Sequence, residues 1–395
     1  MKKRFNKFIN KKIFLLSNSS RYIFQYRLLL LNELKNYFKE IYIVAPFDES
    51  SSELKKYGEF INWKILLKKN YSLINFTRSF TQLLFKIKKI KPDIVHSHTL
   101  KSNLLISMIS FFLGINTVLS FAGMGRLSES KGFKKLFLRF ILKIIYFLSI
   151  YNLENFFIRT NYKRVKFIFQ NPIDIQFFIN CFHKPIKNDF FYLIPGSGVP
   201  ERYFNSIKKI LLKKEEKIEF IYCARLEKSK GIKLFLDLSF YYPNAKFFVY
   251  GELSGSSDEL LDKNQIELYK KKNKNLFFKN YVKDPLIKHH NNNSIFIIPS
   301  IYGEGLPRGI LEALSLEIPV VASKKSCVGL FDKSNVFVAK DNNLNSYLEE
   351  IEKIISYKKI GILENFLNYN KKLVFKKYKE TIIVKNTLEL YEKFE

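Results

Sequence analysis

The sequence predicts an α/β protein of two domains, each built on a doubly wound, Rossmann-like parallel sheet. Three observations support this fold class. Short runs rich in Ile, Val and Phe alternate with helix-like stretches along nearly all of the 395 residues. These runs are apolar at consecutive positions, as expected for strands covered by helices on both faces. The alternation is interrupted once, by the Pro- and Gly-rich stretch 194–204, "IPGSGVPERYF".

The predicted elements form two series, one on either side of that interruption. The first series has strands at 12–16, 41–45, 93–96, 117–121, 166–170 and 192–194, with long helices at 22–38 and 72–90. The second has strands at 218–223, 246–250, 276–281, 294–298, 319–322 and 336–339. We therefore expect an N-terminal domain at 1–198 and a C-terminal domain at 199–374. A final helix at 375–395 could pack on either domain, including back on the N-terminal one.

Composition narrows the functional classes. Hydrophobic residues make up 47% of the chain, which argues against disorder. The net charge of +31 favours anionic partners such as membrane lipids, nucleotide diphosphates or nucleic acid, although a low-GC genome would produce the same lysine-rich bias. The three cysteines form no CxxC pair, so we expect neither disulfides nor a zinc site. The basic N-terminus has no uninterrupted apolar core, and we therefore predict a cytoplasmic protein without a secretion signal.

Two apolar stretches bear on membrane association. The first, 102–125, carries no charge over its 24 residues, but "GIN" and "AGMG" divide it into a helix and a strand, which favours a buried segment. The second begins at Lys134 and places Lys135, Arg139 and Lys143 within a strongly apolar helix. Such a helix could lie on an anionic membrane, or it could be a core helix whose basic side chains reach solvent.

Two carboxylates stand eight positions apart in 294–323, "SIFIIPSIYGEGLPRGILEALSLEIPVVAS". The pattern predicts a strand, a Gly-rich loop, a helix with Pro307 at its first position, and a second strand. Glu304 then lies in the loop and Glu312 on the helix. Acidic side chains beside the anion-attracting end of a helix indicate hydroxyl donors such as those of a sugar. The alternative is that Glu304 caps the helix and Glu312 is solvated.

A second motif, "FIYCARLEKSKGIKLFLDL" at 220–238, places basic side chains at the end of another buried strand. Arg225 and Lys230 lie between this strand and the helix that begins near Gly231. Two cations and a helix N-terminus at the mouth of a parallel sheet are suited to a diphosphate. In a chain with 67 basic residues, solvated surface charges are the alternative interpretation.

Together the two motifs resemble the donor half of the family four retaining glycosyltransferases, the glycosyl transferases of group 1, which have the GT-B fold of two Rossmann-like domains facing across a cleft. The stretches "KPDIVHSHTLKSNLL" and "IPGSGVPERYF" are similar to that family as well. The motifs "EGLPR", "HTLKS" and "FAGMG" are most similar to those of bacterial members that act on polyprenyl-diphosphate-linked saccharides. The resemblance implies transfer of a hexose or N-acetylhexosamine from a nucleotide-sugar, expected to be UDP-linked, in surface polysaccharide or lipopolysaccharide biosynthesis.

The resemblance also implies roles for individual residues. Arg225 and Lys230 would stabilise the charge that develops on the leaving diphosphate, and Glu304 would bind the donor sugar hydroxyls. Of the other implied donor contacts, Glu312 would bind the ribose hydroxyls. The backbone N–H groups of Gly305 and Leu306 would help to hold the sugar, and Val282 would lie near the base. The family implies no cofactor and a metal-independent reaction, and the sequence contains no Asp-x-Asp triplet.

The sequence gives fewer indications of the residues that contact the acceptor. His98, at the end of the strand in "VHSHT", and Lys101 could face the acceptor, although a core histidine is the alternative for His98. Arg126, just after "AGMG", could bind the acceptor's diphosphate. The implied partners are a nucleotide-sugar, a lipid-linked saccharide and an anionic membrane surface, at the inner face of the plasma membrane. No nucleic acid is expected.

The chain also departs from the family pattern. The segment 17–20, "SNSS", stands where relatives have a Gly-rich loop, and Ala122 and Gly123 stand where many have a histidine. Two other functions remain open on the sequence alone. One is a UDP-sugar epimerase with the same fold, which would need no lipid acceptor. The other is a basic, non-catalytic nucleic-acid-binding protein, although the aromatic residues are not arrayed beside basic ones as stacking platforms.

Overall fold

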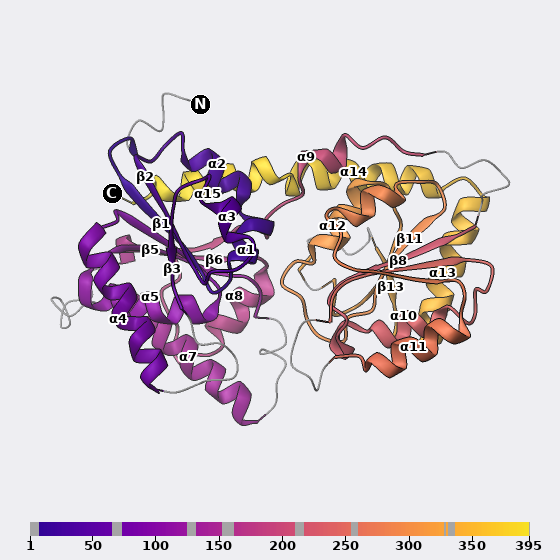
Figure 1. The fold of residues 1–395 in the computed structure, drawn as a ribbon, viewed down its shortest axis with the longest axis horizontal. Coiled ribbons are helices and arrows are strands. Elements are labelled where there is room, and N and C mark those ends of the chain that lie inside the picture. Colours follow the sequence, from indigo (N-terminus) through magenta and orange to yellow (C-terminus); the bar gives the residue numbers. More distant parts are fainter. Residues whose placement is uncertain are drawn as a thin grey trace. The chain divides into compact units, whose positions relative to one another are not determined.

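The computed structural model describes residues 8–64, 73–124, 132–151, 162–209, 217–253, 260–327, 329–330 and 336–394. The chain forms two compact units (Figure 1), Met1–Ser197 with Ile383–Glu395, and Gly198–Ile382. Each unit contains one parallel sheet, with strand order β3-β2-β1-β4-β5-β6-β7 in unit 1 and β10-β9-β8-β11-β12-β13 in unit 2. The predicted fold class of two doubly wound parallel sheets is confirmed.

The sheet of unit 1 contains all six predicted strands of the first series, each shifted by no more than two residues at either end. Its strands are β1 (Lys12–Ser17), β2 (Glu40–Ala45), β3 (Glu59–Asn62), β4 (Ile94–His98), β5 (Asn116–Phe121), β6 (Val165–Phe169) and β7 (Phe191–Leu193). The edge strand β3 was missed because only Ile61 of its four residues is buried. The strand order reverses between the adjacent strands β1 and β4, where ligands bind in such sheets.

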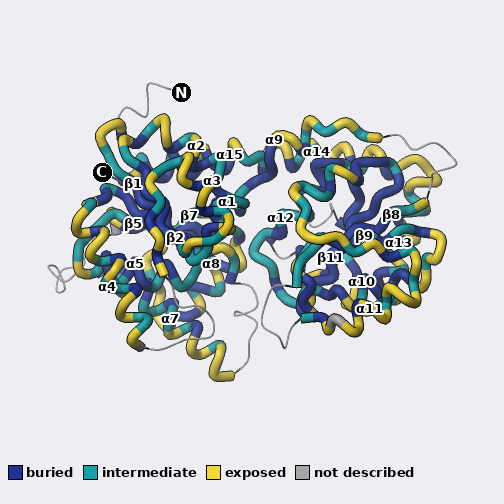
Figure 2. The backbone as a smooth tube through the Cα atoms, viewed as in Figure 1, coloured by how far each residue is buried: buried dark blue, intermediate teal, exposed yellow. Residues whose placement is uncertain are grey.

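Helices cover both faces of this sheet. One face packs against α4 (Leu73–Ile90), α5 (Leu100–Leu113), α7 (Phe133–Ile150) and α8 (Pro172–Ile179). The other packs against α1 (Ser20–Tyr26), α2 (Leu28–Leu34), α3 (Ser51–Leu54) and the C-terminal helix α15 (Glu380–Tyr391). A short 3-10 turn, η3 (Tyr162–Arg164), precedes β6. Figure 2 shows the buried strands enclosed by helices with exposed outer surfaces.

Two predicted features of unit 1 have clear outcomes. The described part of the uncharged stretch, 102–124, is a largely buried helix followed by a strand, as expected, and Gly114 ends α5 in the left-handed conformation (φ 61°). The single helix expected at 22–38 is wrong: α1 and α2 are separated at Arg27 (φ −133°, ψ 10°). The Arg27 guanidinium donates to the Gly196 carbonyl at 3.3 Å and to the Tyr22 hydroxyl at 3.0 Å. The interruption between the two helices therefore lies at a buried, hydrogen-bonded cation.

Unit 2 repeats the layered arrangement. Its strands are β8 (Glu219–Cys223), β9 (Lys246–Tyr250), β10 (Leu276–Lys279), β11 (Ser294–Ile298), β12 (Val320–Ser323) and β13 (Phe337–Ala339). Helices α10 (Ile232–Leu238), α11 (Lys263–Lys272) and α13 (Leu344–Lys359) pack on one face. On the other lie α9 (Glu201–Phe204), α12 (Arg308–Ser315) and α14 (Leu363–Tyr378). The short turns η5 (Lys228–Lys230) and η7 (Pro285–His289) precede α10 and β11. The strand order reverses between β8 and β11.

The C-terminal segment differs from the single helix expected at 375–395. Helix α14 ends at Tyr378, Lys379 is extended (φ −60°, ψ 135°), and α15 follows. The break allows Lys379 to pair with Val199: the Val199 N–H donates to the Tyr378 carbonyl at 2.8 Å, and the Glu380 N–H donates to the Val199 carbonyl at 2.9 Å. The segment that enters unit 2 therefore lies beside the segment that leaves it.

Candidate active site

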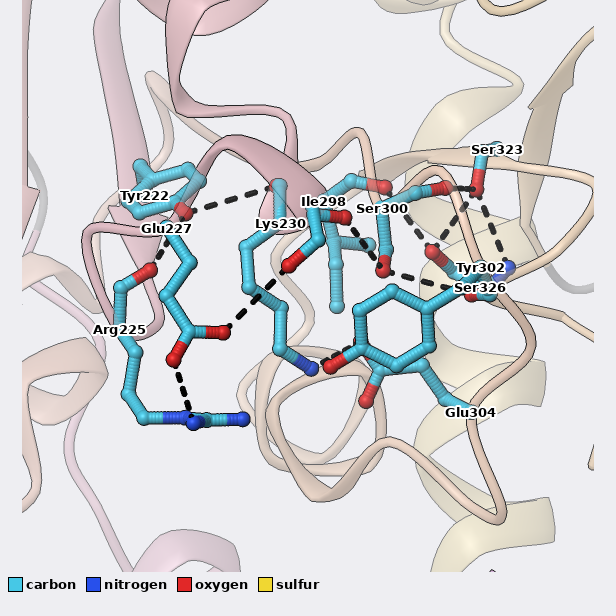
Figure 3. Close-up of polar contacts among 11 residues, drawn as sticks. Tyr222, Arg225, Glu227, Lys230, Ile298, Ser300, Tyr302, Glu304, Ser323 and Ser326 are labelled. Atoms are coloured by element: carbon cyan, nitrogen blue, oxygen red, sulfur yellow. Dashed lines mark hydrogen bonds and ion pairs between the residues drawn. The ribbon is translucent and has the colours of Figure 1, made fainter. Parts of the chain in front are cut away.

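The predicted donor residues lie where β8 and β11 end side by side. Arg225 and Lys230 follow β8, and Glu304 follows β11. The Lys230 Nζ atom lies 2.7 Å from the Glu304 Oε1 atom (Figure 3), and the two side chains are only 12% and 16% exposed. Of the two interpretations of Glu304, the helix-capping one is wrong, because Pro307 is the N-cap residue of α12 and makes no side-chain capping bond. Pro307 accordingly stands one position before the first helical residue.

Lys230 is held as a cation in a largely buried position. Its Nζ atom lies 4.6 Å from the centre of the Tyr302 ring, so the ammonium contacts a carboxylate and an aromatic face together (Figure 3). Burial works against the charge, but the Glu304 carboxylate and the Tyr302 side chain outweigh it and raise the pKa of Lys230. Tyr302 is a contact that the sequence did not single out, since nothing in its spacing distinguishes it from a loop aromatic.

Gly231 shapes the turn that carries Lys230. It has a φ of 73° and is the N-cap of α10. A Cβ atom at this position would lie 2.0 Å from the Pro299 carbonyl oxygen, which belongs to the segment leading from β11 to Glu304. Only glycine fits both the backbone conformation and this close approach. The loops that carry Lys230 and Glu304 are thus packed backbone against backbone at Gly231.

A buried carboxylate orients Arg225. The Arg225 Nη1 atom donates to Glu227 Oε1 at 2.6 Å, and the Ser229 hydroxyl donates to Glu227 Oε2 at 3.4 Å. The Glu227 side chain is 5% exposed, whereas that of Arg225 is 50% exposed. The Tyr222 hydroxyl contacts the carbonyls of Arg225 at 3.1 Å and Lys230 at 3.4 Å. Sequence reasoning missed Glu227, because burial of a lone acid in a basic loop leaves no periodicity to detect.

Serine hydroxyls fix the loop that carries Glu304. The Ser323 hydroxyl donates to the Ser300 carbonyl at 2.6 Å, and the Ser326 hydroxyl donates to the Ile298 carbonyl at 3.2 Å (Figure 3). The segment after β12 also contacts this loop. A Cβ atom at Gly329 would lie 1.7 Å from the carbonyl oxygen of Gly305, which is one of the predicted donor contacts. The Gly-rich loop is therefore packed against hydroxyl groups and a glycine that lie at and after the end of β12.

Glu312 is not a solvated surface charge. It lies on α12 with its side chain 15% exposed, and Arg308 Nε donates to its Oε1 atom at 2.7 Å. Burial raises the pKa of Glu312, although the Arg308 guanidinium acts in the opposite direction. The other two predicted donor contacts, Leu306 and Val282, are partly buried and pack against the apolar cluster beneath α12. The structure thus gathers the predicted donor residues on the segments that follow β8, β10 and β11 and in the middle of α12.

The candidate acceptor residues belong to unit 1. His98 ends β4, is fully buried, and neither of its ring nitrogens has a hydrogen-bond partner among the residues described. Burial, followed by His96 and Arg27, lowers the pKa of His98 well below its usual range, so the ring is neutral. Lys101 is half-buried on the first turn of α5. Arg126 lies outside the described residues.

Among the described residues there is neither a candidate metal-binding cluster nor a helix suited to crossing a membrane. No group of three or more His, Cys, Asp or Glu side chains in the described ranges is arranged to hold a metal ion. Within those same ranges, no helix combines the length and the apolar character needed to cross a bilayer.

Comparison with known proteins gives a consistent picture. The family model described as glycosyl transferases group 1 matches residues 204–373, and the glycosyl transferase 4-like model matches residues 12–158. The chain is 25% identical over 373 residues to a capsular polysaccharide biosynthesis glycosyltransferase, CapM, of Staphylococcus aureus, covering 90% of each chain. It is 24% identical to the N,N'-diacetylbacillosaminyl-diphospho-undecaprenol alpha-1,3-N-acetylgalactosaminyltransferase of Campylobacter jejuni, covering 97% of this chain and 98% of the relative.

Solved structures share the fold. The Anabaena protein Alr3699/HepE in complex with UDP-glucose superposes with a TM-score of 0.72 at 14% identity, covering 97% of this chain and 100% of the other. A glycosyltransferase from Rickettsia africae superposes with a TM-score of 0.72 at 15% identity, covering 98% of both chains. The arrangement of two parallel sheets is therefore that of GT-B glycosyltransferases.

Proposed function

Because the chain belongs to the glycosyl transferases of group 1, we propose that it transfers a hexose or N-acetylhexosamine from a UDP-sugar to a saccharide carried on polyprenyl diphosphate, in surface polysaccharide or lipopolysaccharide assembly. The contact between Lys230 and Glu304 is the observation that carries this proposal. It joins a buried cation, suited to a diphosphate, to a carboxylate suited to sugar hydroxyls, at the strand ends where α/β sheets bind ligands. The relatives from Staphylococcus and Campylobacter support the assignment to polysaccharide assembly and to a lipid-linked acceptor.

The proposed reaction retains the configuration of the sugar and uses no metal ion. The bond between the anomeric carbon and the phosphate oxygen breaks, and the acceptor hydroxyl oxygen bonds to the same face of the sugar. The hydroxyl proton passes to the leaving phosphate oxygen, so UDP is the second product. Arg225 and Lys230 stabilise the negative charge that develops on the diphosphate. Glu304, with the backbone N–H groups of Gly305 and Leu306, holds the transferred sugar.

We assign the remaining donor contacts and the acceptor to separate elements. Glu312 binds the ribose hydroxyls, and Val282 contacts the base. The acceptor is assigned to unit 1, with His98, Lys101 and Arg126 as its candidate contacts. His98 supports this assignment because it is a buried, neutral histidine with unsatisfied ring nitrogens where β1 and β4 end side by side.

The proposed activity is tested by incubating the protein with a panel of UDP-sugars and a polyprenyl-diphosphate-linked saccharide. We expect UDP release that depends on the acceptor, a product whose anomeric configuration matches the donor, and no inhibition by a chelator. Formation of a free sugar isomer without acceptor would indicate an epimerase instead. Salt-sensitive binding of a single-stranded oligonucleotide, with no binding of UDP, would indicate a nucleic-acid-binding protein.

We further propose that α7 holds the protein at an anionic membrane. Its inner face packs into unit 1 through Leu138, Leu142 and Ile145. Its outer face is apolar as well, with Phe133, Leu136, Phe137, Phe140 and Phe147 between 44% and 80% exposed. The helix contains Lys134, Lys135, Arg139 and Lys143 and no acidic residue. Exposed aromatic side chains flanked by cations match the interface of an anionic bilayer.

Replacing the four basic residues of α7 by glutamine should weaken binding to phosphatidylglycerol vesicles by about a thousandfold, at roughly 1 kcal/mol per cation. Flotation with vesicles measures the effect. The matched control removes the same charge from α11 and the loop after it, at Lys270, Lys271, Lys272 and Lys274, which are all exposed. Equal losses in the two variants, or no loss in the first, would place membrane binding elsewhere.

A further inference from the structure

Unit 1 contains a buried arginine that has no acidic partner. Arg27, at the break between α1 and α2, is 8% exposed. Its Nη1 atom donates to the Gly196 carbonyl and its Nη2 atom to the Tyr22 hydroxyl, whereas its Nε atom has no hydrogen-bond partner among the described residues. No carboxylate in the described part of the chain forms an ion pair with it. Lys230, the buried cation of the donor site, differs in this respect, because it contacts Glu304.

The hydrogen-bonding capacity of this guanidinium indicates a ligand. A charged group inside a protein is unfavourable unless its charge and its hydrogen-bonding groups are both compensated. A guanidinium has five N–H donors in a planar fork, and the contacts with Gly196 and Tyr22 use two of them. Both of these acceptors are neutral, so the charge itself is not balanced. The remaining donors suit an anion with several oxygen atoms, and a phosphoryl group matches the planar fork of an arginine.

A second side chain with unused polar atoms, that of His98, lies beside the same tyrosine. The centres of the His98 and Tyr22 rings are 5.6 Å apart, and the guanidinium carbon of Arg27 lies 5.7 Å from the centre of the Tyr22 ring. His98 ends β4, which pairs with β1 where the strand order of the sheet reverses. Neither of its ring nitrogens has a partner among the described residues, and a neutral imidazole has one N–H group to donate. Arg27 and His98 therefore hold unused donors in the same region of unit 1.

A small cavity adjoins Arg27. Its volume is about 10 Å³, and its lining includes Arg27, His96, Ser120 and Gly196. Such a volume admits about one oxygen atom, so it suits a terminal phosphoryl oxygen and is too small for a sugar ring. The His96 ring is already engaged, because its nitrogens contact the Tyr391 hydroxyl at 2.5 Å and the Ser120 hydroxyl at 2.7 Å. Arg27 is therefore the group of this cavity that can bind an anion.

We propose that Arg27 binds a phosphoryl group of the acceptor's diphosphate, with the N–H group of His98 as a second donor to it. The inference rests on the proposed function, which assigns a lipid-linked acceptor to unit 1. It names the part of the acceptor that is bound and the cation that binds it. UDP has the same diphosphate chemistry, but the candidate donor residues all lie within Gly198–Ile382, in unit 2. The experiment therefore has to distinguish these two sources of a phosphoryl group.

The test measures binding of inorganic pyrophosphate to the full chain by calorimetry, with UDP at saturation so that the donor site is filled. We expect Arg27→Met to bind pyrophosphate about ten- to a hundredfold more weakly, as for loss of hydrogen bonds to a charged group, while its affinity for UDP is unchanged. In transfer assays the KM for the lipid-linked saccharide should rise, and the KM for the UDP-sugar should not. Arg164→Met is the matched control, because Arg164 also donates to a backbone carbonyl of unit 1, that of Gly114, but is exposed.

A structural role for Arg27 leads to different results. Because an unbalanced buried cation destabilises the unbound protein, Arg27→Met should keep its thermal midpoint, and pyrophosphate should raise the midpoint of the unchanged protein but not that of the variant. A lower midpoint together with unaltered affinity for pyrophosphate would show that Arg27 only holds Gly196 and Tyr22. If Arg27→Met does not fold, Arg27→Lys keeps the charge without the planar fork and should still weaken pyrophosphate binding.

Other outcomes separate this inference from the proposed function. If the unchanged protein does not bind pyrophosphate once UDP fills the donor site, or if Arg27→Met weakens UDP binding instead, the inference is refuted. Transfer to a lipid-linked saccharide that is unaffected by Arg27→Met would refute it as well, while leaving the proposed function intact. Pyrophosphate binding that depends on Arg27, without transfer to any lipid-linked saccharide, would refute the proposed acceptor and leave only an anion site in unit 1.

Discussion

Replacing Lys230 by alanine is expected to lower the rate of sugar transfer by about a hundred- to thousandfold, the effect typical of removing one group that stabilises charge in a transition state. The ammonium is largely buried, and the carboxylate at 2.7 Å keeps it charged. A fixed cation in such a site needs no reorganisation when charge develops on the diphosphate. Steady-state release of UDP with acceptor present measures the loss.

Loss of stability has to be separated from loss of catalysis in this variant. Alanine at position 230 leaves the Glu304 carboxylate buried without its cation, which is destabilising in itself. The double variant Lys230→Ala/Glu304→Gln removes the stranded charge, so it should regain stability without regaining activity. Lys233→Ala is the matched control, because that lysine pairs with Asp237 at 2.8 Å while 71% exposed. Transfer by Lys230→Ala at close to the normal rate would contradict the proposed role.

Replacing Gly231 by alanine is expected to cost about 3 kcal/mol of folding free energy. Roughly 1 kcal/mol comes from forcing a residue with a side chain to a φ of 73°, and the remainder from overpacking against the backbone of Pro299. The Pro299 carbonyl cannot move without displacing the segment that carries Glu304. Transfer should therefore fall together with stability. Denaturant unfolding, analysed for each unit's transition, measures the change in free energy.

Gly361 provides the control for the backbone term. Its φ is 75°, close to that of Gly231, but a Cβ atom there would meet nothing within 4 Å. Gly361→Ala should therefore cost only about 1 kcal/mol, which is the conformational part alone. Equal destabilisation by the two substitutions would show that the contact with Pro299 contributes nothing.

The sequence predicted the sheets well because their strands are buried on both faces and so form continuous apolar runs. The sequence-based prediction of elements failed where the local pattern and the tertiary contacts disagree. The edge strand β3 is half exposed and carries no such run. The break at Arg27 exists because its guanidinium bonds to Gly196, which is 169 residues away in the sequence. The break at Lys379 likewise reflects pairing with Val199.

The same limit applies to the candidate site. Spacing identified Arg225, Lys230, Glu304 and Glu312, because glycine and proline around them mark strand ends and a helix start. It did not identify their supports. Glu227 beneath Arg225 is recognised by its burial, and Tyr302 beside Lys230 by a contact between segments that are distant in sequence. A sequence pattern locates groups that face a ligand more readily than groups that hold those groups in place.

Unit 1 is discontinuous in the sequence, and this affects how the protein is made. Five apolar residues of its last helix, Ile383, Val384, Leu388, Leu390 and Tyr391, complete a core shared with β1 and β2. All of unit 2 lies between the two segments of unit 1, so unit 1 cannot complete its core until residues 198–382 have been synthesised. Until α15 emerges, the nascent N-terminal region exposes an apolar surface. The first-made part of the chain therefore has to wait for the last helix before it can reach its native state, and the growing polypeptide is most prone to misassembly during that interval.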